Sequence, residues 1–189
     1  FTRRGENDRY RWLLNDMDRS LLFEGHNAIE RIRAENNINL QHRMIQKLSM
    51  AEPFQNHLID VQSIYTATIL SEPKMLEQLA NVSDRYRNEY LYHAARWNTE
   101  WESWLHVGYQ RTKDRLSIVV DKSYMDLKSN FNLGDTVNLV IRANVPNVAL
   151  HFNGHLIPVL PYNGKYFKGR KIKLTAPEYA AGRKFHGWL

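Results

Sequence analysis

The spacing of apolar residues changes once along this chain of 189 residues, and that change is the strongest constraint on its fold. From about residue 38 to residue 115, apolar side chains recur every three or four positions, as on one face of a helix. From Leu116 onward they alternate with polar side chains, as in a half-buried strand. The pattern predicts an α+β fold, with a helical part at 1–115 and a small antiparallel β domain at 116–189.

A strand is also expected near the N-terminus. Residues 9–15 first alternate polar and apolar side chains and follow a Gly-Glu-Asn-Asp turn at 5–8. This arrangement is typical of the return strand of a β-hairpin. The predicted fold is therefore a hairpin strand, then a helical bundle, then the β domain.

Helix-start signals divide the helical part. Ser49 to Glu52 matches a capping box with Pro53 behind it, and Ser71-Glu72-Pro73 predicts the next helix start. A second capping box begins at Thr99. Along the second of these helices, apolar and aromatic residues recur at helical spacing and form one stripe. Such stripes far more often pack into a core than bind a cofactor, so we expect this stripe to be buried, His93 included. The stripe consists of Met75, Leu79, Val82, Tyr86, Tyr90, His93 and Trp97.

The β domain is predicted from four alternating segments and the turn signals between them. The strands are expected at 116–121, 136–143, 148–152 and 171–176, with turns at 132–135, 153–154, 163–164 and 168–169.

The net charge of +6 lies entirely in this domain, because residues 1–115 hold 16 basic and 16 acidic residues and residues 116–189 hold 10 and 4. Its basic residues alternate with apolar and turn residues, which favours a solvated sheet face over a polyanion site. The basic residues are Lys165, Lys168, Arg170, Lys171, Lys173, Arg183 and Lys184.

Several classes of function are excluded by residues that the sequence lacks. There is no cysteine, which rules out disulfides, thiolate metal sites and cysteine nucleophiles. We find no glycine-rich phosphate loop, no His-Glu-x-x-His helix, no Gly-x-Ser-x-Gly elbow and no apolar run long enough for a membrane span.

One short motif has chemical potential. Asp16-Met17-Asp18 directly follows the predicted strand at 9–15. Carboxylates that leave the end of a rigid strand can hold Mg²⁺, which takes one or two protein carboxylates and fills its other positions with water and phosphate oxygens. On pattern alone, a loop or helix-cap role for these aspartates is more frequent.

The residues around this motif favour a metal-binding role for the two aspartates over a loop or helix-cap role. Residues 10–18, Tyr-Arg-Trp-Leu-Leu-Asn-Asp-Met-Asp, resemble a segment of the spore coat protein H family of atypical kinases (CotH-like kinases). Later landmarks of that family have counterparts in the same order, in Leu48 to Phe54, in His93-Ala-Ala-Arg-Trp97 and in the tryptophan-bearing stretch from Trp101 to Arg115. The C-terminal part resembles a β module of the internalin B-repeat type, through Tyr166 to Ala176 and Phe185-His-Gly-Trp188.

The resemblance implies an ATP-dependent protein kinase that uses Mg²⁺ or Mn²⁺. Asp16 would be the metal-binding aspartate and Asp18 the second acid that assists the metal or holds the loop. In the family, the phosphate-covering loop, the nucleotide lysine and the base-like aspartate precede this strand, so the chain is expected to be the C-terminal half of such a kinase and inactive alone. Family habit also implies export to the periplasm, cell surface or medium, and an unidentified protein substrate.

A non-catalytic alternative remains open. The chain could be a secreted or surface protein whose kinase-like body is degenerate and whose β module binds a glycan or a protein. Tyr162, Tyr166, Phe167 and Trp188 could then stack on a ligand, although their packing as the core of the module is the more frequent use of such residues. Nucleic-acid binding is the least favoured reading, because no recognition helix or aromatic base-reading platform is evident.

Overall fold

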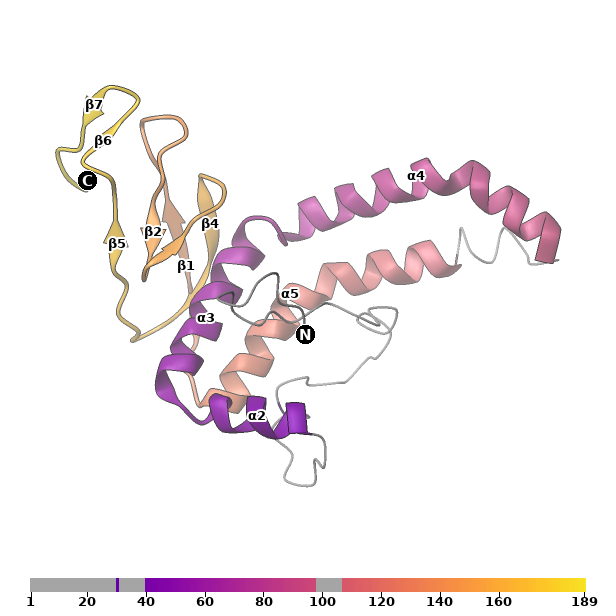
Figure 1. Ribbon diagram of the computed structural model, residues 1–189, viewed down its shortest axis with the longest axis horizontal. Helices are drawn as coiled ribbons and strands as arrows, with labels where there is room; N and C mark the ends of the chain where they lie inside the picture. Colours follow the sequence, from indigo (N-terminus) through magenta and orange to yellow (C-terminus); the bar gives the residue numbers. More distant parts are fainter. Residues whose placement is uncertain (1–29, 31–39, 98–106) are drawn as a thin grey trace, which may run out of the picture.

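The computed structural model describes residues 30, 40–97 and 107–189, and it has the expected α+β fold. Helices come first and short antiparallel strands follow (Figure 1). The helices are α2 (Leu40–Ser49), α3 (Glu52–Ala67), α4 (Glu72–Trp97) and α5 (Tyr109–Phe131). The strands are β1 (Thr136–Ile141), β2 (His151–Phe152), β3 (His155–Leu156), β4 (Tyr162–Phe167), β5 (Leu174–Thr175), β6 (Tyr179–Ala180) and β7 (Arg183–Lys184).

Helices α3 and α4 begin at the predicted positions, and each carries Glu and Pro at its start. The predicted cap of α3 was wrong, however. Ser49 is the last residue of α2, and its hydroxyl donates a hydrogen bond to the Gln46 carbonyl (2.7 Å). Ala51 takes the N-cap position in extended conformation and makes no side-chain cap. Pro53 still favours the start, because a proline in the first turn forfeits no helical hydrogen bond.

The predicted strand at 116–121 was also wrong, because these residues belong to α5. Three consecutive β-branched residues at 118–120 imitate a strand over a short window. Over the longer window, apolar residues recur at helical spacing: Leu116, Val120, Tyr124, Leu127 and Phe131. The helix ends at Phe131, and its C-cap Asn132 adopts the left-handed conformation common at such ends. The predicted domain boundary at residue 116 therefore lies inside α5.

The strands form three small antiparallel sheets, β1–β4, β3–β2–β5 and β6–β7. Strand β1 pairs with β4 from Thr136 opposite Phe167 to Ile141 opposite Tyr162. The other three predicted strands after residue 132 appear as β1, β2 and β5 within the expected ranges. Asn153 and Gly154 turn the β2–β3 hairpin with positive φ at both positions, as predicted.

The turn predicted at Asn163-Gly164 was wrong, because both residues lie within β4 opposite β1. The glycine serves close packing instead. A Cβ built on Gly164 would lie 2.3 Å from the Cβ of Ala67 at the end of α3. Gly164 therefore allows α3 to approach the strand more closely than any other residue would.

One hydrophobic core joins the helices to the strands. Its helical members are Ile59 and Ile64 of α3 and Tyr124 and Leu127 of α5. The strands and the loops between them contribute Ile141, Leu150, Phe152, Ile157, Tyr162, Tyr166 and Phe167. The sheets therefore dock directly on α3 and the C-terminal part of α5.

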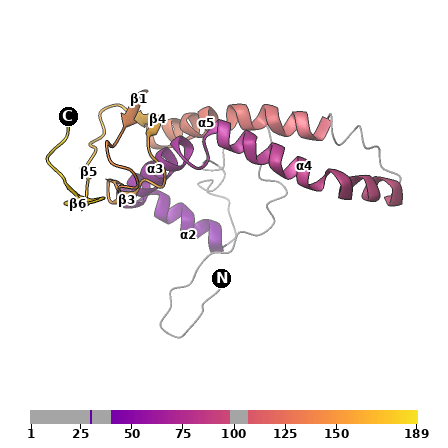
Figure 2. The same ribbon diagram turned by 90° about the horizontal axis from the view of Figure 1, so that it is seen from above.

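Away from this core, α4 and the N-terminal part of α5 run side by side as a projecting helix pair, visible in both views (Figures 1 and 2). Here the predicted packing of the α4 stripe was wrong for several members. Val82, Tyr86 and Trp97 are 51%, 53% and 61% exposed, and His93 is exposed as well. Only Ser83 and Ala94 of α4 are buried. Among the described helices, α4 is covered mainly by α5. One face of α4 is enough for this contact, and the stripe residues outside that face remain exposed.

Candidate functional site

The residues predicted to bind the metal, Asp16 and Asp18, lie outside the described residues, as does the strand predicted at 9–15. The part of Trp101 to Arg115 before residue 107 lies outside them too. Within residues 40–97 and 107–189, no three side chains of His, Cys, Asp or Glu gather where they could hold a metal ion.

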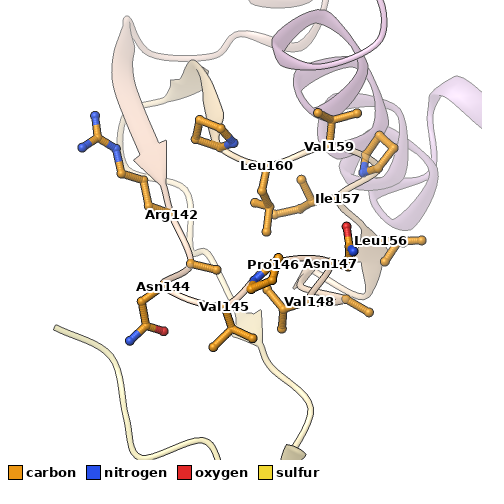
Figure 3. A pocket seen from close by; sticks show the side chains of 14 residues that line it. Arg142, Asn144, Val145, Pro146, Asn147, Val148, Leu156, Ile157, Val159 and Leu160 are labelled. Atoms are coloured by element: carbon orange, nitrogen blue, oxygen red, sulfur yellow. The ribbon is translucent and has the colours of Figure 1, made fainter. Parts of the chain in front are cut away.

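The described part does contain an open hollow of about 790 Å³ in the β region (Figure 3). It lies between the loop that follows β1 and the segment that joins β3 to β4. Figure 3 shows Pro146 and Val148 on one side of the hollow, with Ile157 and Leu160 on the other and Arg142 at its edge. The full lining is residues 142–149 and 156–161.

The chemistry of this hollow is suited to contact rather than to catalysis. Among the described residues that line it, Arg142 is the one charged residue, and the others are mostly Val, Pro, Leu, Ile and Ala, with two asparagines. None of these described side chains can act as a general base or as a nucleophile. Its volume is within the range of small-molecule sites. Sequence reasoning missed it, although Val145-Pro146 and Pro158 to Pro161 on either side of the Asn153-Gly154 turn were an available signal.

A buried polar cluster connects α3 to the strands. The Tyr166 hydroxyl donates a hydrogen bond to Asp60 Oδ1 (2.5 Å), and the Asn153 amide donates to the same oxygen (3.0 Å). Asn153 also accepts a hydrogen bond from the backbone N–H of Lys173 (2.7 Å). Asp60 is 5% exposed and Tyr166 is 1% exposed. Burial, and then the hydrogen bond to Asp60, raises the pKa of Tyr166 to about 12.

Two more tyrosines connect α3, α5 and β4. Tyr124 of α5 donates to the Lys165 carbonyl (2.9 Å), and its hydroxyl lies 3.1 Å from that of Thr66. The Tyr162 hydroxyl reaches the carbonyls of Ser63 (3.4 Å) and Lys165 (3.3 Å). Burial raises the pKa of both phenols above their ordinary value. The two hydroxyls are thus neutral hydrogen-bonding groups of the core.

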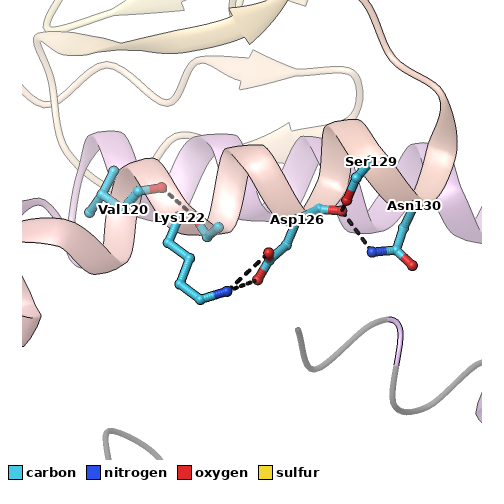
Figure 4. A network of polar contacts seen from close by, with 6 residues as sticks. Val120, Lys122, Asp126, Ser129 and Asn130 are labelled. Carbon is cyan, nitrogen blue, oxygen red and sulfur yellow. Dashed lines mark hydrogen bonds and ion pairs between the residues drawn. The ribbon is translucent and has the colours of Figure 1, made fainter. Parts of the chain in front are cut away.

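The acidic residue at the middle of the C-terminal half of α5 is engaged within the helix (Figure 4). Asp126 forms an ion pair with Lys122 one turn earlier (2.9 Å). Its backbone carbonyl accepts hydrogen bonds from Ser129 (3.1 Å) and Asn130 (2.9 Å). These contacts are local helix stabilisation.

The aromatic residues considered for ligand stacking divide into two groups. Tyr162, Tyr166 and Phe167 are 0–1% exposed and belong to the core, so the packing interpretation is confirmed for them. Trp188 is 49% exposed and packs edge-on against Phe185, with ring centroids 5.2 Å apart.

The basic residues of the β region mostly face solvent, as expected of a solvated face. Lys168, Lys171, Lys173, Arg183 and Lys184 are exposed. Lys165 is half-buried and pairs with Asp121 of α5 (2.7 Å), and Arg170 is half-buried and donates to Asn56 of α3.

Two histidines from distant parts of the chain also meet in this region. His57 of α3 and His155 of β3 have ring centroids 4.7 Å apart at an interplanar angle of 64°. Sequence reasoning did not pair them, because residues 98 positions apart carry no spacing signal.

Comparisons with known proteins found no match: no family model, no curated protein and no solved structure matches this chain. Among the described helices, none is both long enough and apolar enough to cross a membrane.

Proposed function

We propose that this chain is part of a CotH-like kinase and supplies the metal-binding carboxylates of an ATP-dependent phosphotransfer site. Asp16 would hold Mg²⁺ or Mn²⁺, and Asp18 would assist the metal or hold its loop. The observation that supports this most is the order of landmarks in the sequence, in which the Asp-x-Asp motif after an apolar segment is followed by the helix starts and the His-x-x-Arg-Trp string.

The chemistry of the proposed site is that of a hard cation held by carboxylates. Such a metal, when bound, neutralises phosphate charge and orients the phosphoryl group. The described helices and strands would serve as the scaffold behind this site. We expect phosphotransfer only in a protein that also supplies a phosphate-covering loop, a nucleotide lysine and an acceptor-orienting aspartate.

Metal binding can be tested on the chain as it stands. Titration with Mn²⁺, followed by electron paramagnetic resonance, should show binding that strengthens with ATP and is lost in Asp16→Asn. A matched control is Asp84→Asn, because Asp84 is exposed and makes only a surface pair with Arg87 (3.3 Å). Equal Mn²⁺ binding by wild type and Asp16→Asn would contradict the assignment.

The activity itself needs a second assay. In a longer protein that contains this chain, γ-labelled ATP with Mg²⁺ or Mn²⁺ should transfer label to protein, and Asp16→Ala should reduce the transfer at least about a hundredfold. Asp84→Asn should transfer normally. Unchanged transfer by Asp16→Ala would refute the metal role of Asp16.

A second candidate is non-catalytic binding of an acidic glycan by the C-terminal segment, in a protein exported from the cell. It is favoured by the exposed pair of Trp188 and Phe185, which lies close in sequence to Arg183 and Lys184. Aromatic faces stack on sugar rings, and the neighbouring cations suit sulfated or carboxylated sugars. A glycan array should then show binding that Trp188→Ala abolishes and Tyr92→Ala, at an exposed position on α4, retains.

A further inference from the structure

The contact between His57 and His155 joins two rigid elements. His57 lies on α3 two residues before Ile59, and His155 lies on β3 opposite Phe152. Ile59 and Phe152 are each 0% exposed, so the core anchors both backbones. The two rings are therefore held near each other by the fold, although the His57 side chain itself is exposed and accessible to solvent.

The separation of the rings matches a shared metal ion. Zinc binds histidine nitrogen at about 2.0–2.1 Å, so two imidazoles on one tetrahedral ion have ring centres about 5 Å apart. The observed separation of the ring centroids is 4.7 Å, and the rings meet edge to face at an interplanar angle of 64°. Zinc binding requires the exposed His57 ring to turn from this edge-to-face arrangement until one nitrogen of each ring is directed at a common point.

The surroundings supply charges of both signs. Asp60 lies one helical turn after His57 on α3 and is buried in the cluster with Tyr166 and Asn153. The Arg170 guanidinium is held by Asn56. No third His, Cys, Asp or Glu in the described ranges completes a ligand group, so water would fill the remaining positions on the ion.

We propose that His57 and His155 form a two-histidine binding site for Zn²⁺ that ties α3 to the β2–β3 hairpin. Imidazole is a preferred ligand of zinc, whereas Mg²⁺ takes oxygen ligands. The proposed site uses neither Asp16 nor Asp18 as a ligand and does not depend on the proposed phosphotransfer. It stabilises the fold, because the ion binds the docked arrangement and not the unfolded chain.

The test is thermal unfolding of the tag-free chain, with each variant compared with and without Zn²⁺. Zinc should raise the melting temperature of the wild type by about 2–4 °C, and Mg²⁺ should not. The rise should disappear in both His57→Gln and His155→Gln. It should persist in His93→Gln, whose histidine is exposed on α4, and in Asp16→Asn, which tests the other proposal.

Because each variant is its own reference, a change in stability without metal does not affect the comparison. A second measurement uses paramagnetic Ni²⁺, which should broaden the ring resonances of His57 and His155 before those of His93. The proposal is overturned if zinc has no effect on the wild type, if either substitution at 57 or 155 leaves the rise intact, or if Ni²⁺ broadens His93 first.

Discussion

At the scale of single residues, a hydrogen bond from Tyr166 of β4 to the buried Asp60 of α3 joins a strand to a helix. A buried carboxylate is costly unless its oxygens are hydrogen-bonded, and here the donors come from a strand and a hairpin turn far along the chain. The cluster therefore couples the position of α3 to that of the strands.

Tyr166→Phe removes one donor to Asp60 without changing the packing of the ring. We expect the free energy of unfolding to fall by about 1–3 kcal/mol, because within the described residues the Asp60 carboxylate then keeps only the donor from Asn153. Urea denaturation measures this. The control is Tyr179→Phe, whose side chain is 60% exposed. Equal stability of Tyr166→Phe and the wild type would show that the hydrogen bond contributes nothing net.

The raised pKa of Tyr166 predicts a loss of stability at alkaline pH. Tyrosine in the unfolded chain titrates near pH 10, and Tyr166 in the folded protein titrates at about 12. Between these values the unfolded chain loses its proton first, so this contribution is complete below pH 10 and declines toward pH 12, by about 2–3 kcal/mol. Urea midpoints measured from pH 9 to 12 should fall less steeply in Tyr166→Phe. Identical slopes would contradict the shift.

Gly164 is a residue whose role depends on a neighbour in space. Gly164→Ala places a methyl group 2.3 Å from the Ala67 methyl, so it should destabilise the protein by about 1–3 kcal/mol. Adding Ala67→Gly removes the contact with residue 67 and should restore part of the loss, although the new methyl group remains 3.1 Å from Tyr162 and glycine in a helix costs about 0.5–1 kcal/mol. A thermal double-mutant cycle measures the coupling. Strictly additive effects would mean that the two residues do not meet.

At the scale of elements, helix α5 shows that a short stretch of sequence can predict the wrong secondary structure. Its three β-branched residues at 118–120 imitate a strand, but local propensity is outweighed by the packing of a full helical face. The starts of α3 and α4 were predictable, because Glu-Pro at a helix start acts locally. The exposure of the α4 stripe was not predictable, because the spacing of apolar residues shows which face of a helix is apolar and not whether another element covers it.

The helical assignment of α5 has a direct test. In a helix, Leu127 faces the core at 2% exposure and Met125 faces solvent at 68%. Leu127→Ala should therefore cost about 2–5 kcal/mol, and Met125→Ala should change stability by less than about 0.5 kcal/mol. Chemical denaturation of the two variants measures the difference. A comparable loss of stability in both variants would contradict the assignment of Leu127 to the buried face of the helix and Met125 to its exposed face.

At the scale of the whole molecule, the strands and helices share one core, and neither side of it is complete alone. Several of the strands are only two residues long, and the sheets have two or three strands. Such small sheets are marginal without packing against something else. Here α3 and α5 provide this packing, through Ile59, Ile64 and Leu127.

We therefore expect residues 132–189 to lack a cooperative fold when expressed alone. Circular dichroism of that segment should show no sigmoidal thermal transition, whereas the full chain should unfold with one. A matched segment that begins at residue 40 keeps α3 and α5 and should retain the transition. A cooperative transition in the short segment would show that the strands are an independent domain.

Local signals in the sequence predicted the right element at Glu72-Pro73, at Asn153-Gly154 and in the alternation of β1, and the wrong one at 116–121 and at Asn163-Gly164. Three outcomes could be seen only in the folded protein: Asn163-Gly164 lies within a strand, the α4 stripe is largely exposed, and His57 meets His155. The physical reason is that these outcomes depend on packing between residues far apart in the chain, and periodicity carries no information about which distant surface a residue will meet.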